Sequence, residues 1–325
     1  MMKCSSCGSA AVFHDRHKNG SFCKEHFFSS VEGKFSDAVK EFGMVRPGDR
    51  VLVSFSGGKD SALALFLLKK LLDSRNDFKL AALLIDEGIS GYRDRSIPVA
   101  EDFCRSLSVP LYIADLKKAF SRSVDEISKD LDVLSTCTFC GELREHLGFV
   151  LSGSMNANKL ALGFNQLDYA RHLLGFYCFD DASRIASINP IFPPDGLSPV
   201  QRILPLCRIS QKEVALYVYL KKLRIDPGDC PFQAKLRDSG RSFHHDSARM
   251  LYALDAKYGL KSGMLHTFES RVSPAVTARF LSDKSPERRC QGCGSFFKPP
   301  EKYFFSPGLL CGQCKGSVGI KETFE

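Results

Sequence analysis

The sequence Val51-Leu-Val-Ser-Phe-Ser-Gly-Gly-Lys-Asp-Ser61 joins an apolar run of strand length to a glycine pair, a lysine and the start of a helix. Gly57 and Gly58 permit backbone conformations that are closed to residues with a Cβ. Consecutive N–H groups can therefore converge on an anion at the positive end of the following helix. This stretch predicts a phosphate-binding loop.

The polar side chains of the loop favour the same ligand. Ser56 and Ser61 add hydroxyl donors, Lys59 adds a mobile cation, and Asp60 stands where a carboxylate favours the helix dipole or Mg²⁺. The order Ser-Gly-Gly-x-Asp-Ser differs from the Walker pattern and resembles the PP-loop of the ATP pyrophosphatases. That resemblance implies binding of ATP and Mg²⁺ and activation of a carbonyl oxygen as its adenylate. The alternative interpretation is an ordinary turn between a strand and a helix.

Strand and helix patterns alternate on either side of this loop, which predicts a doubly wound α/β fold around a parallel sheet. The expected strands cover 51–55, 79–86, 109–114, 159–163 and 203–206, and the expected helices cover 27–42, 61–72, 96–107 and 210–223. Ligands bind such sheets at the carboxyl ends of strands. Asp86 ends the second strand, so we expect it near the ribose or adenine, with a helix cap as the alternative role.

Composition bounds the function classes. The 325 residues are 44% hydrophobic, enough for a core, and the net charge of +8 suits a polyanionic partner such as RNA. No apolar run reaches the length of a membrane span, and we expect a protein of the reducing cytosol with no membrane partner. Of the thirteen cysteines, Cys104, Cys178 and Cys207 stand alone in apolar surroundings and are expected in the core.

Two of the cysteine groups have the spacing of structural zinc sites. Cys4-x2-Cys7 and Cys23-x2-His26 offer three thiolates and an imidazole to one Zn²⁺. Near the other end, two complete Cys-x2-Cys knuckles have the arrangement of a zinc ribbon and predict a second Zn²⁺; their ligands are Cys290, Cys293, Cys311 and Cys314. Aromatic and basic residues between these knuckles predict either a small core or contact with RNA bases.

A third group of cysteines lacks a fourth partner. Cys137-Thr-Phe-Cys140 directly precedes an expected helix, whose N-terminus would favour the thiolates, and Cys230 lies in a comparable loop. Three thiolates would hold an iron–sulfur cube and leave one iron open to a substrate atom. The alternative is a redox or persulfide-forming dithiol at Cys137 and Cys140, with Cys230 as a packing residue.

The succession of these motifs resembles the TtcA/TtuA family of tRNA 2-thiouridine synthetases, and most closely its two-zinc branch, which is related to the eukaryotic wobble-uridine thiolation subunit. The resemblance spans nearly the whole chain. It implies ATP-dependent exchange of the C2 oxygen of a tRNA uridine for sulfur, with a 4Fe–4S cluster on Cys137, Cys140 and Cys230. It also implies a ubiquitin-like sulfur carrier or another sulfur donor as partner, and either a homodimer or a partner subunit.

The chain departs from that family after the fourth strand. Where the family has Gly-His-Asn-x-Asp-Asp, this sequence reads Gly163-Phe-Asn-Gln-Leu-Asp168. Gly163 and Asn165 are expected at the nucleotide, and Asp168 is the candidate to replace the missing carboxylate at Leu167. A one-residue shift rotates a helical side chain by about 100°. Arg144 stands where related enzymes carry a Lys, and it keeps the positive charge.

The chain is therefore interpreted as a cytoplasmic tRNA sulfurtransferase. The expected domains are a zinc finger, a connecting helix, the PP-loop domain, a helical extension, a zinc ribbon and a tail, at 1–27, 28–48, 49–233, 234–285, 286–316 and 317–325. Leu167 and Phe164 motivate a rival: a weakened paralogue that binds tRNA or a partner subunit. A further alternative, an amide-forming enzyme that uses ammonia, gives the cysteines no role.

Overall fold

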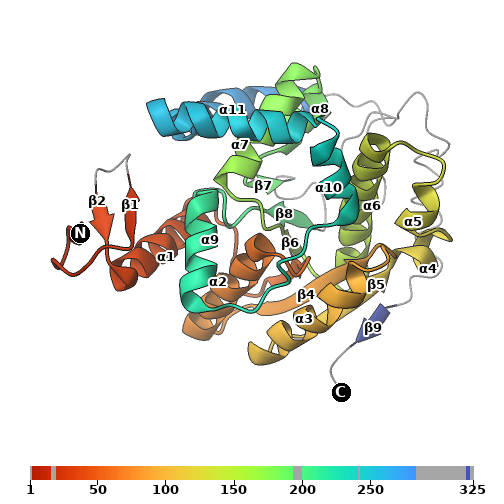
Figure 1. Ribbon diagram of the computed structural model, residues 1–325, viewed down its shortest axis with the longest axis horizontal. Helices are drawn as coiled ribbons and strands as arrows, with labels where there is room; N and C mark the ends of the chain where they lie inside the picture. Colours follow the sequence, from red (N-terminus) through yellow and green to blue (C-terminus); the bar gives the residue numbers. More distant parts are fainter. Residues whose placement is uncertain (1, 16–19, 193–199, 241, 283–319, 323–325) are drawn as a thin grey trace.

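The computed structural model describes residues 2–15, 20–192, 200–240, 242–282 and 320–322 (Figure 1). A central sheet has the order β7-β8-β6-β3-β4-β5-β9. Its five inner strands run parallel; they are β3 (Arg50–Ser54), β4 (Lys79–Asp86), β5 (Leu111–Asp115), β6 (Lys159–Ala161) and β8 (Gln201–Ile203). This arrangement confirms the predicted α/β fold class.

The two edge strands run antiparallel to the rest: β7 (Ile191–Phe192) pairs with β8, and β9 (Ile320–Glu322) pairs with β5. The chain order along the sheet reverses between β3 and β6, both of which are inner strands. Connections on opposite faces diverge at such a switch point and leave a crevice at the carboxyl ends of the strands. The predicted phosphate-binding loop, Ser56 to Ser61, follows β3 at that point; we call it the glycine loop.

Helices surround the sheet (Figure 1). Those that flank it or connect its strands are α1 (Lys24–Glu41), α2 (Lys59–Arg75), α3 (Arg93–Ser106), α4 (Leu116–Phe120), α5 (Val124–Ile127), α6 (Val133–Ser154), α7 (Gln166–Cys178), α8 (Ala182–Ser187) and α9 (Gln211–Lys221). The helices after them are α10 (Pro231–Asp238), α11 (Phe243–Tyr258), α12 (Leu260–Thr267), the π-helical turn η1 (Phe268–Val272) and α13 (Ser273–Ser282). The predicted helix over 27–42 corresponds to α1, and its aromatic stripe lies in the core as expected.

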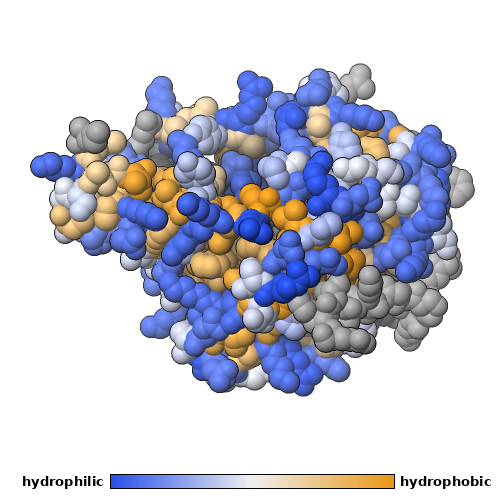
Figure 2. Space-filling model, turned by 60° about the horizontal axis from the view of Figure 1, so that its bottom comes forward, coloured by the Kyte–Doolittle hydropathy of each residue, from blue (hydrophilic) through white to orange (hydrophobic). Residues whose placement is uncertain are grey.

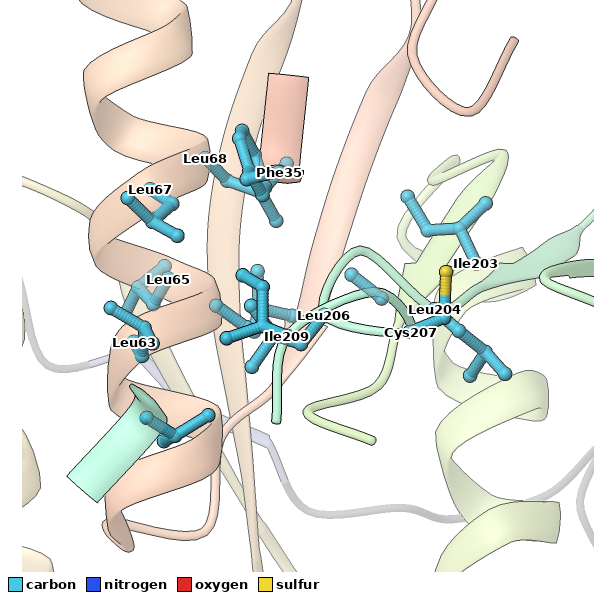
Figure 3. Packing of buried hydrophobic residues seen from close by; sticks show 14 of the residues in the cluster. Phe35, Leu63, Leu65, Leu67, Leu68, Ile203, Leu204, Leu206, Cys207 and Ile209 are labelled. Atoms are coloured by element: carbon cyan, nitrogen blue, oxygen red, sulfur yellow. The ribbon is translucent and has the colours of Figure 1, made fainter. Parts of the chain in front are cut away.

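The main core packs α2 against the segment that follows β8. Figure 3 shows leucines of α2 facing the 203–209 segment, with Phe35 of α1 nearby. Leu63, Leu65 and Ile209 have no exposed surface. Burying one such side chain contributes roughly 1.5–3 kcal/mol to folding. The helix that follows the glycine loop is therefore fixed over its first two turns, which holds the loop in place.

Three expectations about local structure were wrong. The last inner strand covers Gln201–Ile203 rather than 203–206, because the chain turns away from the sheet after Ile203 and places its next apolar side chains against α2. Cys137 and Cys140 lie inside α6, since Asp132 caps that helix by accepting from the Ser135 N–H. Cys178 is exposed at the end of α7, whereas Cys104 and Cys207 are buried as predicted.

Within the described ranges, none of the helices combines the length and the apolar composition that crossing a membrane requires. Figure 2 shows hydrophilic residues over most of one face, with apolar residues in a band across its middle.

Candidate active site and metal centre

The glycine loop forms a turn closed by its own serines. Gly57 has φ +82°, a left-handed conformation that strains any residue with a Cβ. The Ser61 hydroxyl donates to the Gly58 carbonyl (3.1 Å) and accepts from the Ser56 N–H (3.2 Å). Gly58 caps α2, and because glycine has no side chain, it makes no capping bond to the N–H groups of the first turn. An anion can bind N–H groups in this position.

The segment after β6 packs directly on this loop. A Cβ on Gly163 would lie 2.7 Å from the Ser61 nitrogen, so only glycine lets the two backbones approach this closely. The Asn165 amide donates to Asp60 Oδ1 (2.9 Å), and the Lys59 ammonium donates to Asp60 Oδ2 (2.8 Å). Asp60 is thus held between an amide and a cation, and an incoming phosphate can compete for Lys59.

Asp168 lies near the loop despite the one-residue shift. Its carboxylate accepts from the Asn165 N–H (3.2 Å) in a capping box and pairs with Arg171 (2.8 Å). Burial raises the Asp168 pKa, and the charge of Asp60 raises it further. Leu167 is buried in the main core. The capping box turns Asp168 towards the start of α7.

Phe164 stacks on His172 at a centroid distance of 4.8 Å, and His172 donates through Nδ1 to the Asp168 carbonyl (2.7 Å). Since a carbonyl only accepts, Nδ1 carries the proton. Burial lowers the His172 pKa to about 3, helped by the positive charge of Arg171 and by His244 and Arg202. His172 is therefore neutral in the folded protein at neutral pH.

The protein is expected to lose stability in mild acid because of His172. The unfolded chain protonates this residue below its ordinary pKa of about 6.5 and the folded chain does not, so stability is complete above that pH and falls as the pH drops towards 3. By pH 5 the loss from this residue is about 2 kcal/mol. The free energy of unfolding in urea, measured at pH 7 and at pH 5, should differ less in His172→Gln than in the unmodified protein. The variant His266→Gln, which changes an exposed histidine, should show the same difference as the unmodified protein. Equal differences in all three proteins would contradict this assignment.

The end of β4 holds a charged pair that the sequence interpretation missed. Asp86 closes a turn by accepting from the Gly88 N–H (2.8 Å), and burial raises its pKa. Its neighbour Glu87 is fully buried and forms a two-armed ion pair with buried Arg93. Arg93 also donates to the Ser56 carbonyl (3.0 Å) in the glycine loop. A charged residue directly after an apolar strand is the signal for Glu87, but the sequence does not indicate its partner.

The structure brings the three candidate cluster cysteines into one neighbourhood. Cys230 caps α10, and α10 packs on α6, which carries Cys137 and Cys140. Burial raises the Cys140 pKa to about 12; Arg144 opposes this shift, and Glu87, Cys230 and Cys137 add to it. Burial also raises the Cys137 pKa, again with a contribution from Cys230. The expectation that a helix N-terminus favours these thiolates was wrong, because the dipole effect is confined to the first turn.

These thiols fit a cluster better than a single ion. Among the described residues, the group of ligand side chains whose ligand atoms all lie within 4.8 Å of one another is the N-terminal group, and the trio of Cys137, Cys140 and Cys230 is not such a group. A cube binds its thiolates through different irons, so its ligands stand further apart than those of one tetrahedral ion. With their pKa values raised, the half-buried Cys137 and Cys140 thiols are also weak nucleophiles, whereas iron binding removes the proton.

The N-terminal group has the geometry of a closed zinc site. Cys4, Cys7, Cys23 and His26 place their ligand atoms within 4.8 Å of one another. The hairpin β1 (Phe13–Asp15) and β2 (Gly20–Phe22) leads into Cys23, the cap of α1, and Phe13 packs on Phe27 at 5.1 Å. Three sulfurs and one imidazole nitrogen suit Zn²⁺. The second predicted zinc site, at residues 290–314, lies outside the described residues.

Comparisons with known proteins find a matching family model and relatives that span nearly the whole chain. A family model described as a PP-loop domain matches residues 29–131. A probable sulfurtransferase of Methanocaldococcus jannaschii is 28% identical over 99% of this chain and 89% of its own length. The cytoplasmic tRNA 2-thiolation protein 1 of Drosophila yakuba is 30% identical over 99% of this chain and 92% of its own length.

A solved structure shares the fold. The U34-tRNA thiolase NcsA from Methanococcus maripaludis, solved with its 4Fe–4S cluster, superposes with a TM-score of 0.70 over 97% of this chain and 96% of that one. At 23% identity, this likeness concerns the fold.

Proposed function

The chain belongs to the PP-loop family of tRNA 2-thiolation proteins, and from this premise we propose that it is an active, ATP-dependent tRNA sulfurtransferase that converts a uridine to 2-thiouridine. The observation that supports the proposal most strongly is a chain of contacts that joins the glycine loop to α6, the helix that carries Cys137 and Cys140. Glu87 contacts both Arg144, one turn after Cys140, and Arg93, which holds the Ser56 carbonyl. A nucleotide on the loop and a sulfur on the thiols would therefore be neighbours.

ATP binding is assigned to the loop and its surroundings. The N–H groups of Gly57 and Gly58, the hydroxyls of Ser56 and Ser61, and Lys59 would bind the β- and γ-phosphates. Asp60, which Asn165 orients, would bind Mg²⁺. Gly163 permits the close approach of this segment. Asp86, at the carboxyl end of the adjacent strand, is assigned to the ribose or adenine.

The reaction follows in two steps. The uracil O2 attacks the α-phosphorus of ATP as N3 loses its proton; the O2–phosphorus bond forms, and the bond to the β-phosphate breaks to release pyrophosphate. A hydrosulfide then adds to C2, the C2–O2 bond breaks, and AMP leaves with the former uridine oxygen. The cations Lys59 and Arg144 would stabilise the charge that develops on phosphate and sulfur.

Cys137, Cys140 and Cys230 would hold a 4Fe–4S cluster, which when bound would hold the sulfide that the sulfur donor delivers. Asp168, whose pKa is raised by burial, would exchange a proton with the base. This reaction needs a tRNA and a sulfur carrier as partners. It also allows a partner subunit or a second copy of the chain. The rival interpretation is a weakened paralogue, which would bind tRNA or a partner subunit and no longer thiolate.

A deletion strain tests the function in the cell. We expect its tRNA to lose 2-thiouridine at one position, measured by mass spectrometry of nucleosides from mapped fragments. The intact chain should restore the modification, and Lys59→Ala should not. Unchanged 2-thiouridine in the deletion strain would favour the paralogue over the enzyme.

The N-terminal module is expected to bind one structural Zn²⁺, with a second at the C-terminal cysteines. Cys23→Ser should lose one zinc equivalent per chain, measured by elemental analysis, because serine is a poor ligand for the ion. It should also lower the unfolding temperature, since metal binding supplies folding free energy to so small a segment. The exposed Cys178→Ser is the matched control. Equal zinc content in both variants would contradict the site.

A further inference from the structure

Two consecutive carbonyls of the glycine loop are held from outside the loop. Ser56 O accepts from Arg93 Nη1 (3.0 Å), and Gly57 O accepts from the Asp226 N–H (3.2 Å). In a trans peptide the C=O and the following N–H point in opposite directions. Holding these carbonyls therefore turns the N–H groups of Gly57 and Gly58 away from Arg93 and Asp226; the Gly58 N–H donates to the Ser56 hydroxyl (3.4 Å).

The first of these contacts leads to α6. Arg93 pairs with both oxygens of Glu87, and each of the two side chains is at most 4% exposed. Glu87 Oε1 also accepts from Arg144 (3.5 Å), one helical turn after Cys140. An ion pair buried this deeply contributes little net stability compared with apolar packing. What distinguishes this one is that it joins the loop to the cysteine helix; we call it the Glu87 tether.

The second contact leads to Cys230. Asp226 is buried, and its Oδ1 accepts from Arg95 Nε (2.9 Å) and from the Gly228 N–H (3.0 Å). These bonds fix the turn whose next helix is capped by Cys230 and packs on α6. The Asp226 backbone thus donates to Gly57, and its side chain fixes the turn before the cysteine segment; we call this connection the Asp226 tether.

We propose that the two tethers couple nucleotide binding to the cysteine site, with Glu87 and Asp226 as positioning residues. A phosphate that draws in the loop N–H groups shifts the Ser56 and Gly57 carbonyls, and this shift passes to Arg144 through one tether and to Cys230 through the other. Coupling between sites is reciprocal, so the state of the cysteines also changes nucleotide affinity. The inference rests on the proposed function insofar as the loop must bind ATP.

Hydrogen–deuterium exchange of the full chain, without cluster, tests the coupling. The probe is Mg²⁺ with α,β-methylene ATP, whose bridge resists cleavage. Three regions are followed in peptic peptides: the loop, residues 130–144 with Cys137 and Cys140, and residues 225–235 with Cys230. In the unmodified protein we expect the nucleotide to slow exchange in all three, by about fivefold or more in the two cysteine peptides, as typical coupling energies imply.

Each tether variant should uncouple one peptide. Glu87→Gln should keep protection of the loop and of 225–235 and lose it in 130–144. Asp226→Ala should lose it in 225–235 alone, and Asp226→Asn, which keeps an oxygen acceptor for Arg95, should restore it. Glu142→Gln, which removes a surface ion pair with Arg184 on the same α6, is the control and should behave like the unmodified protein. If Glu87→Gln does not fold, the Asp226 pair still decides the question.

The outcomes separate the two proposals. No protection of the loop in the unmodified protein would overturn nucleotide binding and the proposed function with it. Protection of the loop without any change in the two cysteine peptides would overturn the coupling alone. Protection that survives in both tether variants would show that the coupling does not pass through Glu87 and Asp226.

Discussion

Cys230→Ala is expected to abolish tRNA thiolation and to leave nucleotide binding within about twofold of the unmodified protein. The thiol belongs to the trio and not to the glycine loop, and its side chain is dispensable for the cap of α10, which has no side-chain hydrogen bond. Removing even an outer-shell partner of a metal site costs up to about a hundredfold in affinity or activity. Loss of one of three ligands should exceed that figure.

The measurements are iron content, the visible absorbance of anaerobically purified protein, and 2-thiouridine formed in a reconstituted reaction. Cys178→Ala, an exposed cysteine on α7, serves as the matched control and should retain all three. A Cys230→Ala protein that keeps its iron and its activity would remove Cys230 from the site and return it to a packing role.

Gly163→Ala is expected to raise the dissociation constant of ATP by at least about tenfold, or about 1.4 kcal/mol. The added Cβ would lie 2.7 Å from the Ser61 nitrogen and 2.9 Å from the Asp60 carbonyl carbon. Both neighbours are backbone atoms at the start of α2, so the helix end that receives the phosphates must move. Overpacking of this kind also costs roughly 1–3 kcal/mol of stability.

Isothermal calorimetry with α,β-methylene ATP measures the effect. Gly153→Ala is the control, because a Cβ there meets open space and favours α6 by about 0.5–1 kcal/mol. Unchanged affinity in Gly163→Ala would mean that the phosphates do not bind at the start of α2.

The fold was predictable where local pattern and tertiary packing agree. The strand before Ser56 and the helix after it are specified by an apolar run, two glycines and a leucine-rich helix, and the structure has them in these places. The strand at 203–206 was misplaced because apolar character alone does not separate a strand from a buried connection. Cys178 was misassigned because an aromatic neighbourhood can also lie at an exposed helix end.

Only those parts of the candidate site that form short sequence motifs were predictable. The glycine loop and the N-terminal zinc ligands are short-range patterns, and the structure gathers each of them. Glu87, Arg93 and Asp226 act across separations of up to 169 residues, as in the contact between Asp226 and Gly57. Such contacts depend on how the sheet is wound. The helix cap at Asp132, which places Cys137 and Cys140 inside α6, was readable in principle but competed with a loop interpretation.

A single-turnover reaction tests the central claim most directly. The full chain, reconstituted anaerobically with iron and sulfide, is mixed with ATP, Mg²⁺ and tRNA that lacks the modification. Thiolation by the glycine loop and the cysteine trio predicts one 2-thiouridine for each AMP released, with the uridine oxygen recovered in that AMP when the tRNA carries an ¹⁸O label at C2. AMP without 2-thiouridine, or 2-thiouridine without the label in AMP, would contradict it.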